Sequence, residues 1–299
     1  MQGSVTENVN YRIDFLKYRY IWLAVSIAYL LIGAAAYVIK GGFRYHIDFT
    51  GGAELRVSFE QTADIGNVRK AMSSGGWKDA VIQSVGSSNK EFLIRVGSLE
   101  STTEAQIKGA LDKGVADNKV RIDNIQWVGA EAGSDTTRNA VYAVLLSLLI
   151  LLLYIAVRFE FRFGIGAVAC LIHDILAVMV FLLLTGEPIS LHVLASILAV
   201  LGYSMNDTIV IFSRIRENFK KLHGVSEYSI ANLSINQTLT RTLLTSFATV
   251  LSVLAILFIG GESLRGLSLV MLIGIIVGTY SSIYIASPVM LAVKTKKRT

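Results

Sequence analysis

The sequence predicts an α-helical polytopic membrane protein with six transmembrane helices and one inserted α+β ferredoxin-like extracytoplasmic domain. Over half of the residues are hydrophobic (53%), only 17% are charged, and the mean hydropathy is +0.55, which is too apolar for one soluble domain of 299 residues. The apolar residues are also unevenly distributed. Residues 40–138 have the composition of a soluble domain, whereas Leu, Ile, Val and Ala are the commonest residues after Ala140.

Six segments are long enough to cross a membrane, because a helix needs roughly 20 mostly apolar residues to span about 30 Å. The first segment is 20–39. Its run Ala34–Ala36 resembles a signal-peptide cleavage site, but the apolar stretch is too long for a signal peptide, so we expect an uncleaved helix. The other five segments form a predicted bundle over 139–291, at 139–157, 163–184, 192–212, 239–258 and 266–291.

The distribution of Lys and Arg predicts the orientation. Basic residues cluster before the first span, between the second and third, after the fourth and after the sixth, while the opposite short loops hold only Arg265. The positive-inside rule therefore places both termini, residues 1–19 and the basic tail 292–299, in the cytoplasm. The formal charge of +6 reflects these clusters, so we expect contact with membrane lipids and no nucleic-acid partner.

The 40–138 insert shows alternating short strands and helices. We expect strands over 44–59, interrupted at Gly51 and Gly52, and over 80–85, 91–96 and 120–127, with helices over 65–72 and 103–111. The order β-α-β-β-α-β is typical of a ferredoxin-like sandwich. The insert contains no metal-ligand cluster, nucleophile motif or phosphate loop, so we expect a binding or moving part without a cofactor.

Ionisable residues within the predicted spans are functional candidates, since a charge near the bilayer centre costs at least about 2.5–3.5 kcal/mol. Asp207 in the fourth span and Arg241 in the fifth lie about 22 and 26 Å below the outer boundary at 1.5 Å per residue. The sequence therefore predicts that the two form an ion pair. His173 and Asp174 of the third span lie near the midplane.

The fifth span also carries polar residues at helical spacing. A stripe of this length should face protein or water. One interpretation is that its hydroxyls join helices; with an arginine opposite an aspartate, an ion pathway is favoured. The stripe comprises Thr238, Arg241, Thr242, Thr245, Thr249 and Ser252.

A proton pathway follows from the chemistry of this pair. Burial favours the neutral form of Asp207, and a neighbouring guanidinium, which is always charged, favours its ionised form. A change in their separation would therefore decide whether Asp207 holds a proton. Asp174 is a second candidate carrier with His173 as its relay, although a pair that only orients the bundle is the alternative.

Four stretches of the chain form a specific set of motifs: Asp48-Phe-Thr-Gly-Gly52, Arg158-Phe-Glu-Phe-Arg162, Gly202-Tyr-Ser-Met-Asn-Asp-Thr-Ile-Val-Ile-Phe-Ser-Arg-Ile-Arg-Glu-Asn218 and Asn236-Gln-Thr-Leu-Thr-Arg-Thr-Leu-Leu-Thr-Ser246. Together they resemble the SecF branch of the SecD/SecF family, in the resistance-nodulation-division superfamily. The resemblance covers nearly the whole chain.

The resemblance implies a bacterial inner-membrane protein that uses the proton-motive force to draw exported polypeptide outward. It implies a SecD-like homologous half and the SecYEG channel as partners, and Asp207, Arg241 and Thr245 as the functional trio. In this family another essential membrane carboxylate belongs to SecD, so this chain alone would hold part of the proton route.

Two other functions remain open at this point. The chain could be half of a small-molecule or lipid exporter of the same superfamily, although its insert is small for a substrate pocket. It could also be a passive assembly factor of the translocon that conducts no protons. An enzyme is not expected, because no catalytic constellation occurs on either side of the membrane.

Overall fold

The computed structural model describes residues 11–86, 88–97, 103–115 and 118–293. The chain divides into two compact units, one of Met1–Arg44 with Ala143–Thr299 and the other of Tyr45–Tyr142. The second unit corresponds to the insert predicted over 40–138. The predicted N-terminal segment up to residue 10, and the basic tail from residue 294, lie outside the described residues.

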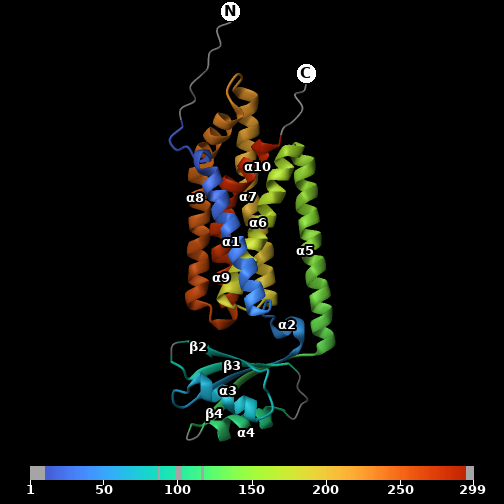
Figure 1. The fold of residues 1–299 in the computed structure, drawn as a ribbon, viewed down its shortest axis with the longest axis vertical. Helices are drawn as coiled ribbons and strands as arrows, with labels where there is room; N and C mark the ends of the chain where they lie inside the picture. Colours follow the sequence, from blue (N-terminus) through green and yellow to red (C-terminus); the bar gives the residue numbers. More distant parts are fainter. Residues whose placement is uncertain (1–10, 87, 98–102, 116–117, 294–299) are drawn as a thin grey trace, which may run out of the picture. The chain divides into compact units, whose positions relative to one another are not determined.

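Within the described residues, six helices are long and apolar enough to cross a membrane, as predicted. Figure 1 shows them as a bundle of long rods. They are α1 (Arg19–Lys40), which follows a 3₁₀ turn (Leu16–Tyr18), α5 (Ala130–Arg158), α6 (Phe161–Thr185), α7 (Leu191–Lys221), α8 (Glu227–Ile259), and the last span, made of α9 (Glu262–Ser281), a π-helical turn (Ser282–Ala286) and α10 (Ser287–Ala292).

Local sequence signals define the ends of the central helices. Ser190 and Ser226 cap α7 and α8, because their hydroxyls accept hydrogen bonds from the amides of Val193 (3.2 Å) and Ser229 (3.1 Å). Gly186 ends α6 in the left-handed conformation. The basic residues after the fourth span continue α7 without a break.

The core of the bundle lies between α6, α7 and the last span, which are about half buried, whereas α1, α5 and α8 expose most of their surface. Glycines allow the closest contacts. A Cβ added at Gly274 or Gly278 would lie 2.2 Å from Val200 or 2.8 Å from Ser204, so these glycines allow α7 and α9 to approach closely. A Cβ on Gly202, by contrast, would meet no atom of the described residues within 4 Å.

The insert contains a four-stranded antiparallel sheet in the order β2-β3-β1-β4. Its strands are β1 (Gly52–Phe59), β2 (Val81–Val85), β3 (Glu91–Val96) and β4 (Val120–Val128). Helices α3 (Ile65–Ser74) and α4 (Thr103–Gly114) lie side by side. Alternate residues of β1, from Ala53 to Phe59, are buried and share one hydrophobic core with residues of α3 and α4.

The segment before β1 differs from the prediction of a strand from residue 44. Residues Ile47–Thr50 form a single helical turn, α2, and β1 begins only at Gly52. Gly51 and Gly52 have φ values of 70° and 119°, which side chains disfavour. A Cβ on Gly52 would lie 2.3 Å from the Val96 carbonyl oxygen, so the two glycines are needed to enter the sheet.

Candidate functional site

Asp207 lies within α7 and is buried, with 1% of its surface exposed. Its Oδ2 accepts a hydrogen bond from Thr279 Oγ1 on α9 (3.4 Å), and Thr279 Oγ1 lies 2.8 Å from Ser246 Oγ on α8. Because Thr279 has one hydroxyl proton, donating it to Asp207 leaves Ser246 as the donor to Thr279. A hydroxyl chain therefore connects the carboxyl of α7 to both neighbouring helices.

Arg241 lies on α8, near enough to Asp207 for its charge to act on the carboxyl group. Within the described part of the chain, however, the carboxylate of Asp207 has no Lys, Arg or His nitrogen within 4.0 Å. Asp207 is buried, whereas Arg241 is exposed on the surface of the chain. The predicted direct ion pair is thus replaced by a longer-range interaction, because Arg241 points away from the core that surrounds Asp207.

The polar stripe of α8 divides between two sides of the helix, which the spacing alone does not reveal. Thr238, Thr242 and Ser246 are buried, while Arg241, Thr245 and Ser252 are exposed. Thr245 Oγ1 donates to the carbonyl of Arg241 (3.1 Å). The buried Thr242 hydroxyl has no hydrogen-bond partner among the described residues.

The outward side of α7 is also unusual for a surface in contact with lipid. Gly202 and Asn206 are both exposed and lie one turn apart. Arg241 of α8 shares a cleft with Ile209 and Ser213, which follow Asn206 on α7. Exposure of an asparagine and an arginine to hydrocarbon is energetically costly, and a glycine there makes no close packing contact. We therefore expect protein to cover this polar face.

The cleft between α7 and α8 has a volume of about 400 Å³ and continues from Arg241 toward the polar ends of the two helices. Arg214 lines its other end and donates hydrogen bonds to Gln237 (2.6 Å) and Glu217 (2.7 Å). Polar and charged side chains therefore line both ends of the cleft, which suits it to hold water.

His173 and Asp174, the other predicted pair, are in direct contact. His173 Nδ1 lies 3.2 Å from Asp174 Oδ1, and the hydroxyl of Ser204 on α7 donates to Asp174 Oδ2. His173 Nε2 lies 3.0 Å from Ser26 Oγ on α1, and Ser26 Oγ lies 2.8 Å from Tyr280 OH on α9. The two residues therefore belong to one buried network that reaches four helices.

The direction of these hydrogen bonds fixes the number of protons on the pair. Tyr280 donates its only hydroxyl proton to the carbonyl of Trp22 (2.7 Å), so Ser26 must donate to Tyr280 and accept from His173 Nε2. The contact between Nδ1 and Asp174 then requires one further proton between them. His173 and Asp174 together hold this proton either as imidazolium with carboxylate or as imidazole with carboxylic acid.

Sequence reasoning missed the hydroxyl groups that complete both clusters. Ser204 lies one turn before Asp207 on α7, so its helical spacing from an intramembrane carboxylate could have marked it as a candidate. No sequence pattern could have identified Ser26, Thr279 and Tyr280, because they lie on segments that are distant in the sequence. Cys170 also borders the network, with Sγ 3.7 Å from Asp174 Oδ2.

Comparisons with known proteins agree with one another. A family model described as "Protein export membrane protein SecD/SecF, C-terminal" matches residues 107–296. The "Protein translocase subunit SecF" of Pseudomonas aeruginosa is 38% identical over 93% of this chain and 90% of its own. That of Escherichia coli O157:H7 is also 38% identical, over 95% of this chain and 88% of its own.

Solved structures give the same result. The chain is similar to the crystal structure of SecDF, a translocon-associated membrane protein from Thermus thermophilus, with a TM-score of 0.85 and 36% identity. The match covers 95% of this chain and 39% of that chain. A SecDF structure in a "Super-membrane-facing form" matches with a TM-score of 0.66. The chain thus spans most of a SecF relative but about two fifths of SecDF.

Proposed function

The chain belongs to the SecD/SecF family of protein-export membrane proteins, and from this premise we propose that it is the SecF-type subunit of a proton-motive-force-driven motor. In this proposal it assists protein export through the SecYEG channel together with a SecD-like half. It lies in the bacterial inner membrane with both termini cytoplasmic, and it acts without a cofactor or enzyme activity.

The observation that carries the proposal is the buried Asp207 carboxyl with the Arg241 guanidinium in electrostatic range. A carboxyl in this setting can exist neutral or charged at low cost only if the distance to Arg241 changes. Each proton that crosses the membrane potential contributes about 2.3 kcal/mol per 100 mV. Opening of the bundle to alternate sides would then couple this energy to motion.

The SecD-like half is proposed to cover the polar face formed by Gly202, Asn206, Arg241 and Thr245. This face supports the assignment because it is exposed in the single chain and too polar to face lipid. The proton route would then run along the interface between the two halves. Arg241 would contact groups of both halves, and Thr245 would line the route one turn away.

The pair His173 and Asp174 serves in this proposal as a second proton carrier. Its network includes Ser26 and Trp22 of α1, the helix that leads into the insert. Loss of the shared proton would reverse or break the hydrogen bonds toward α1. The insert, which we propose is ferredoxin-like on the basis of its strand order, would act as the moving part that contacts exported polypeptide.

The substitution Asp207→Asn tests the proposal, because asparagine keeps the size of the side chain and removes its titration. Proteoliposomes would contain the chain with its SecD-like half and the SecYEG channel. We expect export stimulated by a proton gradient to fall at least tenfold, while the halves still co-purify. Asp207→Glu, which retains a titratable carboxyl, should keep part of the stimulation.

Unchanged gradient-dependent export by Asp207→Asn would reject the motor and favour a passive assembly factor. Loss of co-purification would show that Asp207 acts in assembly instead. Proton uptake by the same proteoliposomes, measured with a pH-sensitive dye, gives an independent readout that a defect in assembly alone would not reproduce.

A further inference from the structure

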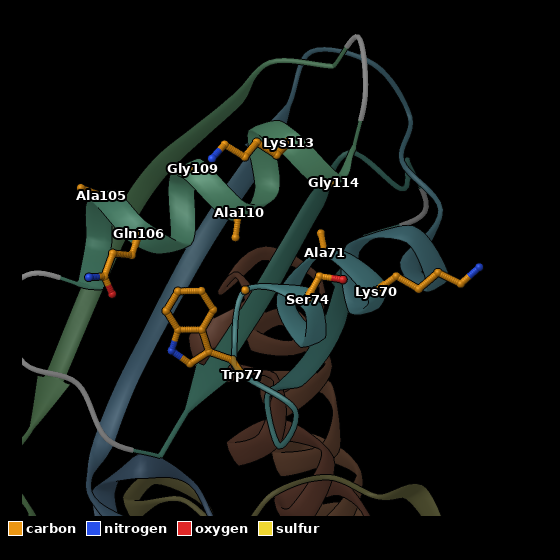
Figure 2. Close-up of a pocket in the computed structure, with 11 residues that line it drawn as sticks. Lys70, Ala71, Ser74, Trp77, Ala105, Gln106, Gly109, Ala110, Lys113 and Gly114 are labelled. Carbon is orange, nitrogen blue, oxygen red and sulfur yellow. The ribbon is translucent and has the colours of Figure 1, made fainter.

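The insert has an open groove between α3 and α4 that the proton pathway does not use. Its volume is about 710 Å³, and Figure 2 shows that residues of both helices and Trp77 line it. The groove lies wholly within the second compact unit. Along α4 it extends from Ala105 to Gly114, about 14 Å at 1.5 Å per helical residue. That length holds about four residues of an extended peptide, at about 3.3 Å each.

Small residues bring the two helices together below the groove. A Cβ on Gly75 would lie 2.7 Å from Ala110 Cβ, and one on Gly114 would lie 2.3 Å from Ala71 Cβ. These contacts fix the spacing of α3 and α4. The groove is therefore a rigid feature of the helix pair.

Gly109, in the interior of α4, has no such packing reason. A Cβ added there would meet no atom of the described residues within 4 Å. A glycine inside a helix costs about 1 kcal/mol relative to alanine. Packing therefore does not require this glycine, and a large side chain at this position would extend into the groove.

The remaining lining combines an indole with positive charge. Trp77 packs partly against the core of the insert and keeps part of its ring at the groove, beside Ala110 and Gln106 in Figure 2. Lys70 and Lys113 lie on α3 and α4, and neither ammonium group has a hydrogen bond or ion pair with another described residue. Among the described residues that line the groove, none is acidic.

We propose that this groove binds an extended, unfolded segment of polypeptide that carries acidic and apolar side chains. Lysine ammonium groups can donate to carboxylates and to any backbone carbonyl, and an indole face accepts many apolar side chains. The groove should therefore favour peptides with acidic side chains but accept many different sequences. This tolerance of sequence is what contact with many exported chains requires. This inference rests on the proposed function, because it assigns the surface that holds the exported polypeptide.

Binding of a defined peptide to the full-length chain in detergent tests the assignment. The probe is a fluorescein-labelled, unstructured decapeptide with alternating Asp and Phe residues, compared with a decapeptide in which Lys replaces Asp. We expect anisotropy to show saturable binding of the acidic peptide and at least tenfold weaker binding of the basic one. Binding should also weaken between 50 and 500 mM salt, because the lysines are exposed.

Two substitutions at one position separate occlusion of the groove from a change in the fold. Gly109→Leu fills the groove and should weaken binding at least tenfold, whereas Gly109→Ala adds one carbon and should leave it unchanged. Both replacements favour the helix, so thermal unfolding should remain at or above the wild-type temperature. The charge reversal Lys113→Glu should weaken binding of the acidic peptide and strengthen that of the basic peptide.

Equal binding by wild type and Gly109→Leu would overturn the proposal. It would also be overturned if Gly109→Leu left peptide binding intact but abolished self-association or binding to vesicles of anionic phospholipid, because the groove would then have another occupant. The assay uses no proton gradient, so Asp207→Asn should bind the peptide like wild type. Failure of the groove and failure of the motor are therefore distinguishable.

Discussion

The cluster around His46 at the start of the insert predicts a specific pH dependence of stability. His46 Nδ1 lies 3.0 Å from Asp48 and Nε2 lies 2.9 Å from Glu54, which also contacts Arg95 at 2.5 Å. Burial alone lowers the pKa of His46, but the hydrogen bonds and charges of both carboxylates raise it to about 9, from 6.5. The imidazolium is therefore bound more tightly in the folded insert than in the unfolded chain.

The sign follows from this raised pKa. The stabilisation is fully present below the unfolded pKa of 6.5 and is lost as the pH rises through about 9. A shift of this size corresponds to at most about 3.4 kcal/mol, which solvent screening of a partly exposed cluster reduces to about 1–2 kcal/mol. Glu54 acts in the opposite range, because burial raises its pKa but His46 and Arg95 lower it overall, so its contribution is lost in acid.

Hydrogen exchange of the β1 and β3 amides, corrected for the intrinsic effect of pH, measures this stability in the full-length chain. Wild type should lose about 1–2 kcal/mol of protection between pH 6.5 and 9.5 relative to His46→Asn, which cannot titrate. If both proteins lose protection in parallel, or if the imidazole of His46 titrates near 6.5 by NMR, the reasoning is refuted.

Two further predictions concern the membrane unit. In Asp174→Asn, the new amide can donate a hydrogen bond to His173, as a protonated Asp174 would. We expect this variant to co-purify with the SecD-like half but to reduce gradient-dependent proton uptake in proteoliposomes. If its uptake equals that of wild type, the pair has only a structural role. Gly274→Leu should destabilise the isolated chain by roughly 1–3 kcal/mol in SDS-unfolding titrations, because the new side chain collides with Val200. The matched Gly202→Leu should leave that stability unchanged but weaken co-purification of the two halves. Equal effects of both leucines on the isolated chain would contradict the proposed interface.

Much of the fold follows from simple rules about the bilayer. Six apolar segments of sufficient length predict six helices, and all six are present among the described residues. The reason is that unpaired backbone N–H and C=O groups are too costly in hydrocarbon, and a helix pairs them within one segment. The strands and helices of the insert were predicted from period and turn residues to within a few positions. The exception is α2, where two glycines with positive φ allow a helical turn in place of an extended chain.

The candidate site was only partly predictable. The cost of burying charge identified Asp207, Arg241, His173 and Asp174 as unusual, and depth counting placed the first two at a similar level. Depth says nothing about the direction in which a side chain points around the helix axis. The structure separates a buried Asp207 from an exposed Arg241, which turns a predicted internal ion pair into an exposed polar face.

The number of spans, the presence of the insert and the identity of the intramembrane charges follow from composition alone, because they depend on local residue types and on the solvent that each segment meets. The folded chain is needed to show which hydroxyls complete the clusters, that hydrogen bonds link His173 and Asp174 to α1, and that α3 and α4 leave a groove between them. These properties depend on contacts between residues that are far apart in the sequence. The packing of whole helices sets the distance between the helices and the rotation of each helix about its axis, and thus decides which side chains meet.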